Sequence, residues 1–211
     1  MSKKIDRKSQ ARIDYWHWPK SFNKKSLIEL NKFIESNFDM YEDKDNHAEN
    51  VKKTSSVKII YYKKMKNILH TIIQTCRQVA NEQFGYDLNE IYDLDGCLLN
   101  IYKSSDSAEY HWHTDGENIL PHVDVKLTVL INVSTKKYEG GDFYICAGKE
   151  KHIKELNEPG NILMLKSHLL HKVTPVTKGE RRTLTIFLKG PSFRWKKYIL
   201  YQVFQEQVIQ Y

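Results

Sequence analysis

Two histidine and aspartate pairs lie close together in the chain, His113 with Asp115 and His122 with Asp124. Side chains two residues apart on an extended strand project from the same face. Either pair could therefore present an imidazole nitrogen and a carboxylate oxygen to one metal ion, and the residue types alone leave both pairs open. They predict a metal site built from nitrogen and oxygen donors.

A distant histidine, His168 or His171, could complete such a site from a later strand. Two histidines and one carboxylate on one face of an octahedron leave three positions open for oxidant and substrate, as in non-haem Fe(II) oxygenases. His171 opens the run HKVTPV, and Arg181 follows ten residues later, after a turn that contains glycine. Two consecutive antiparallel strands would return Arg181 and Thr183 along one face towards the site. A guanidinium and a hydroxyl there could bind a carboxylate.

The elements that would position these side chains are short strands. From about residue 97 the chain consists of short apolar or alternating runs, separated by turn signals such as Gly140-Gly141 and Pro159-Gly160. Seven or eight such strands predict an all-β sandwich or jelly roll. The runs are CLLNIY, AEYHWH, VKLTVLINV, DFYICA, NILMLK, HKVTPV and RTLTIFLKG.

Two helices are expected before this β core. Ser26 with Glu29 forms a capping-box pattern, which predicts a helix that begins near Ser26. A continuous apolar face from Met65 to Ala80 predicts a second helix that ends near Gly85. We expect both helices to pack outside the sheets. The prediction is a mostly β (α+β) single domain over residues 1–211, with a helical support region at 1–96, a catalytic core at 97–190 and a C-terminal extension at 191–211.

The composition is that of a folded protein with a moderate positive charge. Of 211 residues, 40% are hydrophobic and 12% aromatic, which suits one domain with a substantial core. The net charge of +7 is concentrated in the terminal stretches MSKKIDRK and RWKK, and we interpret it as solvated surface charge. The aromatic cluster at residues 15–18 is interpreted as an anchor for the N-terminal segment, with base stacking as the alternative.

Cysteine usage and hydropathy bear on the compartment. Cys76, Cys97 and Cys146 are far apart, which disfavours a disulfide framework and a cysteine zinc site. No apolar run approaches the ~20 residues that a membrane span needs, and the first residues do not resemble a cleavable signal. We therefore expect a cytoplasmic protein without a membrane partner.

Residues 97 to 189 resemble the 2-oxoglutarate and Fe(II)-dependent dioxygenases of the prolyl 4-hydroxylase type. The matching segments stand in that family's order, and the run H-x-V-x-P-V-x-x-G-x-R is the most specific of them. They are LLNIYKSSDSAEYHWHTD, KLTVLINVSTKKYEGGDFYI and PGNILMLKSHLLHKVTPVTKGERRTLTIFL. The resemblance covers almost half of the chain and implies a double-stranded β-helix (jelly roll) as the core.

The resemblance distinguishes between the two candidate pairs. In this family a tyrosine lies three residues before the first ligand and another about ten residues before it, positions that Tyr110 and Tyr102 occupy for His113. It therefore implies that His113, Asp115 and His171 are the catalytic metal ligands.

The remaining histidines are expected to lie outside the set of metal ligands. His122 and Asp124 would belong to a loop that leads into the next strand, and they could still touch substrate. His168 would be a turn residue, because Arg181 follows it by thirteen residues rather than ten. His111 is expected to be solvent-exposed or hydrogen-bonded, with a role at the rim of the site as the alternative.

By the same resemblance, Arg181, Thr183 and Tyr102 would bind the co-substrate 2-oxoglutarate. The implied cofactors are Fe(II), 2-oxoglutarate and dioxygen, and ascorbate is a further candidate. Thr128 falls on the strand that flanks the co-substrate in this family. Many relatives carry a tyrosine further along that strand, where this chain has VLINV, and this departure leaves part of the co-substrate pocket unassigned.

The resemblance implies hydroxylation of an unactivated C–H bond, with release of succinate and carbon dioxide. A prolyl or other residue of a protein or peptide is the first expectation for the substrate, and a free amino acid or a nucleic-acid base is the alternative. Two other classes stay open: a non-catalytic jelly-roll module that binds a metal or a partner, and a zinc metalloprotein. Loss of a ligand or of the arginine would support the first of these classes, and the sequence retains all of them. The zinc metalloprotein would not need Arg181 and Thr183 to face the site.

Overall fold

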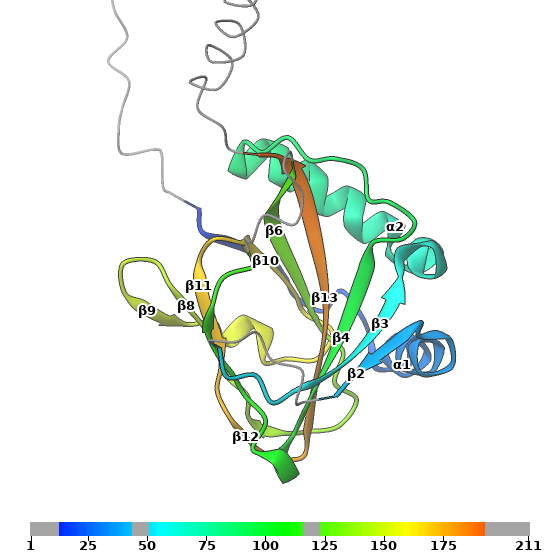
Figure 1. Ribbon diagram of the computed structural model, residues 1–211, viewed down its shortest axis with the longest axis vertical. Coiled ribbons are helices and arrows are strands. Elements are labelled where there is room, and N and C mark those ends of the chain that lie inside the picture. Colours follow the sequence, from blue (N-terminus) through cyan, green and yellow to red (C-terminus); the bar gives the residue numbers. More distant parts are fainter. Residues whose placement is uncertain (1–12, 44–50, 116–122, 193–211) are drawn as a thin grey trace, which may run out of the picture.

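The structure, a computed structural model, describes residues 13–43, 51–115 and 123–192. Two antiparallel sheets form a jelly roll, and two helices lie outside it (Figure 1). The predicted fold class is therefore confirmed. The terminal charge clusters, the segment after residue 192 and His122 lie outside the described residues.

The larger sheet has seven strands and the smaller sheet has four. In spatial order the larger sheet contains β1 (Tyr15–Trp18), β10 (Ile162–Lys166), β6 (Val123–Asn132), β13 (Glu180–Pro191), β4 (Gly96–Lys103), β3 (Ser56–Tyr61) and β2 (Met40–Glu42). The smaller sheet contains β5 (Tyr110–His113), β11 (Leu170–Val173), β8 (Phe143–Cys146) and β9 (Glu150–His152). A separate ladder pairs β7 (Glu139–Gly140) with β12 (Val176–Lys178).

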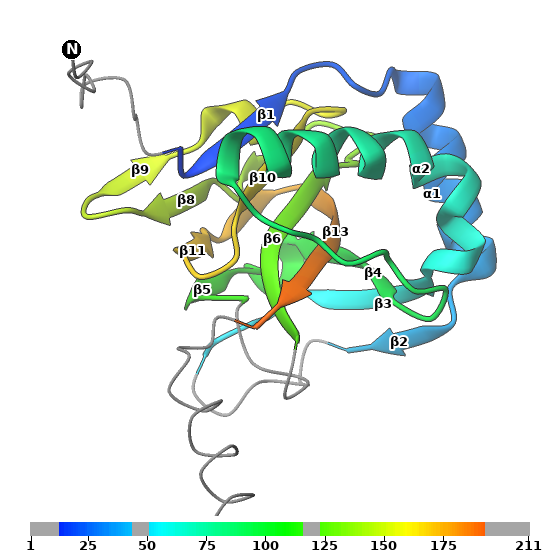
Figure 2. The ribbon, with the colours of Figure 1, turned by 90° about the horizontal axis from the view of Figure 1, so that it is seen from above.

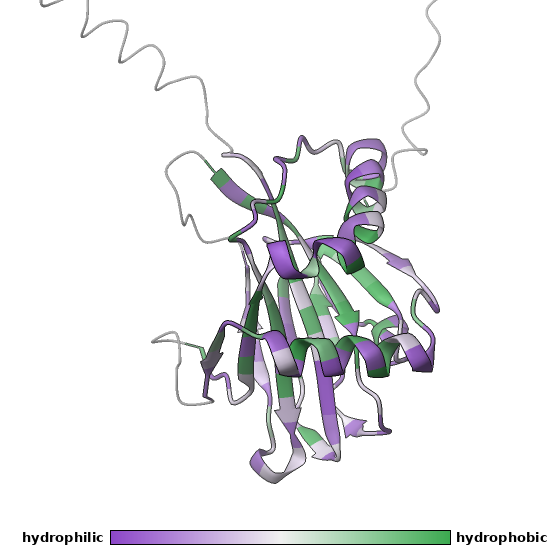
Figure 3. Cartoon of the chain, turned by 90° about the vertical axis from the view of Figure 1, so that its right-hand side faces the viewer, coloured by the Kyte–Doolittle hydropathy of each residue, from purple (hydrophilic) through white to green (hydrophobic). Residues whose placement is uncertain are grey.

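The helices α1 (Lys24–Asn37) and α2 (Tyr62–Val79) cover the outer face of the larger sheet (Figure 2). Their buried residues share one apolar cluster with alternate residues of β4, β6 and β13, and a second cluster fills the space between the two sheets. Seen from the side of the helices, hydrophobic residues gather where the strands pass behind them (Figure 3). Along β13, Leu184 and Ile186 face the helices, which directs Thr183 and Thr185 towards the other sheet.

Both helices lie close to where the sequence predicts them, with one correction at the start of α1. The helix begins at Lys24, and its cap is Asn23 rather than Ser26. The Asn23 side chain accepts a hydrogen bond from the Ser26 backbone N–H at 2.9 Å, so it satisfies one of the free amides of the first turn. After α2, a π-helical turn at Ala80–Phe84 ends at Gly85, whose φ of 65° favours glycine.

Three strands of the larger sheet come from the N-terminal region, which the sequence predicts as helical support. The strands β2 and β3 extend the sheet beyond β4, while β1 pairs with β10 at the opposite edge. Tyr15 lies opposite Leu165 and Trp18 lies opposite Ile162. The aromatic cluster therefore anchors the N-terminal segment on the sheet, as interpreted from the sequence.

The structure describes all three cysteines of the chain. Cys76, Cys97 and Cys146 are free thiols. Within the described ranges, no helix is both long and apolar enough to cross a bilayer.

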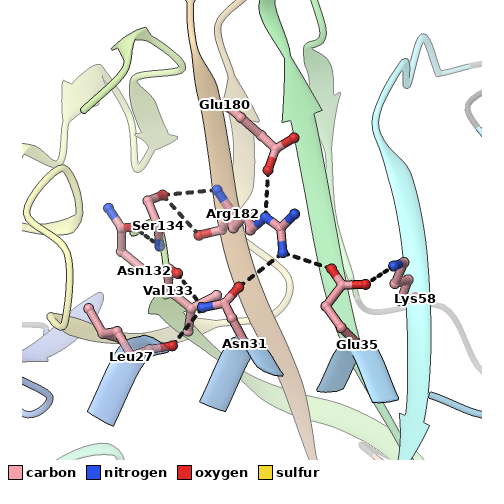
Figure 4. A network of polar contacts seen from close by, with 9 residues as sticks. All are labelled: Leu27, Asn31, Glu35, Lys58, Asn132, Val133, Ser134, Glu180 and Arg182. Carbon is pink, nitrogen blue, oxygen red and sulfur yellow. Dashed lines mark hydrogen bonds and ion pairs between the residues drawn. The ribbon is translucent and has the colours of Figure 1, made fainter. Parts of the chain in front are cut away.

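A polar network connects α1 to the outer face of β13 (Figure 4). The Arg182 guanidinium donates to Asn31 Oδ1 at 3.1 Å, to Glu35 Oε1 at 2.8 Å and to Glu180 Oε1 at 2.6 Å. The Asn31 amide in turn donates to the backbone carbonyl of Val133 at 2.8 Å. The network fixes the helix against the strand that also carries Arg181 on its inner face.

Replacing Arg182 by methionine should reduce the free energy of unfolding by about 2 kcal/mol, because three charge-assisted or polar contacts lose their donor. Urea denaturation followed by circular dichroism would measure this loss. The Lys178→Met variant is a suitable control, since its ion pair with Glu139 is solvent-exposed. Equal stability of the two variants would show that the network contributes little.

Candidate metal and co-substrate site

Three potential ligands converge between the two sheets. His113 on β5 lies directly opposite His171 on β11 in the ladder, and Asp115 follows β5. The Asp115 backbone N–H donates to the Ser167 carbonyl at 2.9 Å, which turns its carboxylate towards both rings. One ligand atom of each residue lies within 4.8 Å of the others. The site therefore brings together the three residues predicted as metal ligands.

The two imidazoles are held by their Nδ1 atoms. His113 Nδ1 lies 2.7 Å from the His111 carbonyl oxygen, and His171 Nδ1 lies 2.9 Å from the Leu169 carbonyl oxygen. A carbonyl accepts only, so both Nδ1 atoms carry the proton and donate it. The Nε2 atoms then face Asp115, at 3.7 Å from Oδ1 for His113 and 3.3 Å from Oδ2 for His171. This arrangement is typical of metal-binding histidines.

Burial and charge favour a neutral His113 beside an ionised carboxylate. Burial, with the nearby His171, lowers the pKa of His113 to about 4. Burial would raise the pKa of the Asp115 carboxyl, but the two imidazoles and a hydrogen bond from Thr128 outweigh it and lower that pKa overall. Burial also acts to lower the pKa of His171, and the charge of Asp115 outweighs it and raises that pKa. A divalent cation would replace the proton that His171 and Asp115 share.

Thr128 on β6 is a positioning residue that sequence reasoning did not assign to the metal site. Its hydroxyl donates to Asp115 Oδ2 at 2.7 Å, and the residue is fully buried. The hydrogen bond holds the carboxylate in one orientation. No local pattern signals this contact, because it joins a strand of the larger sheet to the segment that follows β5 of the smaller sheet.

The Thr128→Val variant should bind Mn(II) or Fe(II) more weakly by about 10- to 100-fold, because it removes the hydroxyl that orients the carboxylate while keeping the side-chain shape. Anaerobic metal titration would measure the change. Thr128→Ser should restore most of the affinity, since serine keeps the donor. A valine variant with unchanged affinity would exclude this role.

A cavity of about 100 Å³ extends from the three ligands along the inner face of the larger sheet. Alternate residues of β13 line it, and Arg181 and Thr183 are opposite Tyr102 and Asn100 in the ladder with β4. Arg181 is 1% exposed, and the centre of its guanidinium lies 5.2 Å from the centre of the Tyr102 ring. Because Gly141 has no side chain, the Arg181 chain has room to pass; a Cβ there would lie 2.8 Å from Arg181 Cδ.

The buried polar atoms in this cavity are incompletely paired within the described part of the chain. Arg181 Nε and Nη1 and Thr183 Oγ1 have no hydrogen-bond partner there. Leaving such donors unpaired costs free energy, which an anionic ligand would recover. The donors and their geometry fit the distal carboxylate of 2-oxoglutarate, and the two histidines with one carboxylate fit Fe(II).

The route by which Arg181 reaches the site differs from the expected one. The sequence predicts two consecutive antiparallel strands that carry His171 and Arg181. Instead, β11 belongs to the smaller sheet and β13 to the larger sheet, with β12 between them in the third ladder. The two residues therefore face each other across the interior of the jelly roll, which brings them to one cavity all the same.

The other histidine and aspartate candidates lie elsewhere. The His111 side chain is exposed, and its Nε2 atom is 3.2 Å from Glu109 Oε2. His168 lies in the turn before β11, as predicted. Asp124 belongs to β6 rather than to a loop, and its partner in the ladder is Gly190. The strand extends further because β13 provides a partner for it.

Residues 97–189 match the model of the 2OG-Fe(II) oxygenase superfamily. Among curated proteins, a PKHD-type hydroxylase of Alteromonas mediterranea is 36% identical over 85 residues, a match that covers 36% of this chain and 36% of the relative. A PKHD-type hydroxylase of Synechococcus is 32% identical over 84 residues, which are 39% of this chain and 37% of the relative. The matches thus span just over a third of each relative.

Solved structures share the fold at low sequence identity. A prolyl-4-hydroxylase of Pseudomonas putida superposes with a TM-score of 0.63 and 16% identity, over 88% of this chain and 97% of its own. A viral collagen prolyl hydroxylase from Paramecium bursaria Chlorella virus-1 gives a TM-score of 0.62 at 14% identity, over 86% and 99% of the chains. Residues 97–189 are therefore similar to the 2OG-Fe(II) oxygenase superfamily, within a fold like that of the prolyl 4-hydroxylases.

Proposed function

We propose that this chain uses Fe(II), 2-oxoglutarate and dioxygen to hydroxylate an unactivated C–H bond, with release of succinate and carbon dioxide. The proposed substrate is a prolyl or other residue of a protein or peptide. The support comes from the superfamily match, the three convergent ligands and the buried unpaired donors beside them. Ascorbate as a further requirement belongs to the same proposal.

One observation carries the proposal: residues suited to hold a metal ion and residues suited to hold a carboxylate line the same cavity. His113, Asp115 and His171 would hold Fe(II), and Arg181 with Thr183 would hold the distal carboxylate of 2-oxoglutarate. Bound Fe(II) would supply the activation of dioxygen that is coupled to decarboxylation of 2-oxoglutarate. The chain's own residues orient the co-substrate and exclude water from the cavity.

A zinc hydrolase or a non-catalytic metal-binding module would use similar ligands. Neither needs a fully buried arginine with free donors in the metal cavity.

The peptide substrate is supported by neighbours in fold. One of them is a prolyl hydroxylase of Trichoplax adhaerens in complex with a hypoxia-inducible factor peptide fragment, with a TM-score of 0.58 and 16% identity. A free amino acid or a nucleic-acid base stays the alternative substrate.

The experiment is to measure succinate formed from 2-oxoglutarate by the purified protein under air, with and without Fe(II). Iron-dependent succinate formation, even slow and without a primary substrate, is expected. Calorimetric binding of 2-oxoglutarate to the Mn(II)-loaded protein gives a second readout that does not depend on turnover. Failure of both succinate formation and 2-oxoglutarate binding would favour the non-catalytic module.

A further inference from the structure

We propose that Lys53 binds a carboxylate of the substrate beside the metal site, so that the preferred substrate is a peptide segment with an acidic side chain next to the reacting residue. This inference rests on the proposed function and specifies its substrate class. It concerns a residue of the N-terminal region, outside the part of the chain that matches the superfamily model.

The backbone around Lys53 is fixed against β5, the strand that carries His113. Lys53 forms an antiparallel bridge with Tyr110. On either side of it, the His111 N–H donates to the Lys52 carbonyl at 2.9 Å and the Thr54 N–H donates to the Glu109 carbonyl at 3.0 Å. The position of Lys53 is therefore set by the same strand that positions a metal ligand.

The side chain of Lys53 lines the cavity and packs on an aromatic ring beside a metal ligand. Its ammonium nitrogen lies 5.1 Å from the centre of the Tyr110 ring, and that ring stacks on the His113 imidazole with centroids 3.4 Å apart. Lys53 lines the same cavity as His113, Asp115 and His171. A positive charge thus lies one ring away from a metal ligand.

Lys53 differs from its neighbour Lys52 in burial and in ion pairing. Lys52 is more exposed and forms an ion pair with Glu109. Lys53 is half-buried, and within the described residues no carboxylate lies at ion-pair distance from it. Burial lowers the pKa of its ammonium group, although the charges of Glu42 and Asp115 act against this. A half-buried cation without a close counter-ion is unfavourable, and a carboxylate from a ligand would relieve that cost.

The position of Arg181 argues against 2-oxoglutarate as the source of this carboxylate. Arg181 packs on Tyr102 and has Thr183 beside it as a further donor, whereas Lys53 packs on Tyr110. The two cations therefore pack on different tyrosines, and Arg181 lies on β13 of the larger sheet whereas Lys53 is bridged to β5 of the smaller sheet. A phosphate is usually bound by several donors together, so a lone lysine is better matched by the single charge of a carboxylate.

The test uses the full chain loaded with Mn(II) and 2-oxoglutarate without oxygen, and blocked tetrapeptides as probes. The probes are acetyl-Gly-Glu-Pro-Gly-amide, its Gln and Lys counterparts, and the same set with the variable residue after proline. Calorimetry should show at least about tenfold tighter binding of a Glu probe than of its Gln counterpart by the unmodified protein. Lys53→Met should remove this preference, and Lys53→Glu should transfer it to the Lys probe.

Lys52→Met is the matched control, and it should retain the preference for the Glu probe. Equal binding of Glu and Gln probes by the unmodified protein, or no binding of either, would overturn the proposal. A Lys53→Met variant that keeps the preference for the Glu probe would overturn it as well. If that variant also requires a higher 2-oxoglutarate concentration, Lys53 belongs to the co-substrate site instead. Iron-dependent succinate formation is measured on the same preparations, so loss of the proposed function is seen separately.

Discussion

The Asp115→Ala variant is expected to lose Fe(II) binding and, with it, iron-dependent consumption of 2-oxoglutarate. Asp115 supplies the one carboxylate of the three convergent residues, and its two oxygens face the Nε2 atoms of His113 and His171. Loss of a residue that merely orients a ligand costs 10–100-fold in metal affinity, so loss of the ligand itself should cost more than about 100-fold. His113→Ala should behave in the same way. Anaerobic titration with Fe(II) or Mn(II) measures both effects.

Histidines outside the three ligands provide the controls. His111→Ala and His168→Ala should keep most of the metal affinity, because the first side chain is exposed and the second lies in a turn. His122→Ala should do so as well; this prediction comes from the sequence, since His122 lies outside the described residues. Loss of metal by the His122 variant, with retention by the Asp115 variant, would mean that the other histidine and aspartate pair is the metal site.

The spacing of the candidate site residues follows the period of a strand, so the sequence alone indicates which of them share a face. Arg181 and Thr183 are two residues apart, so one strand must direct both to the same face. The pattern of the long apolar helix from Met65 is equally local, and its end at Gly85 agrees with the structure. Predictions of this kind need only neighbouring residues.

Pairing between distant segments could not be predicted in the same way. Nothing local shows that β1 will pair with β10, or that β11 and β13 will join different sheets. The roles that depend on such pairings were missed too: Thr128 contacts Asp115 across the interior, and Lys53 reaches the cavity through a single bridge to Tyr110. Threonine and lysine are also common at positions outside any functional site, so the residue types alone do not indicate these roles.

Replacing Arg181 by methionine should raise the 2-oxoglutarate concentration needed for half-maximal turnover by about 10- to 150-fold. The variant removes a charge-assisted carboxylate contact of ~1.5 to 3 kcal/mol while keeping a side chain of similar length in a fully buried position. Metal affinity should change little, because Arg181 is not among the residues that could hold the ion. Succinate formation at graded 2-oxoglutarate concentrations measures the first quantity, and Mn(II) titration measures the second.

Arg181→Lys tests whether charge alone is sufficient. Lysine keeps the positive charge but cannot form two parallel hydrogen bonds with a carboxylate, so its 2-oxoglutarate requirement should lie between those of the methionine variant and the unmodified protein. Arg182→Met is the matched control on the same strand. Its side chain faces α1, so it should lower stability and leave the 2-oxoglutarate requirement unchanged. If Arg182→Met raised that requirement as much as Arg181→Met, the effect would come from distortion of β13 rather than from loss of a carboxylate contact.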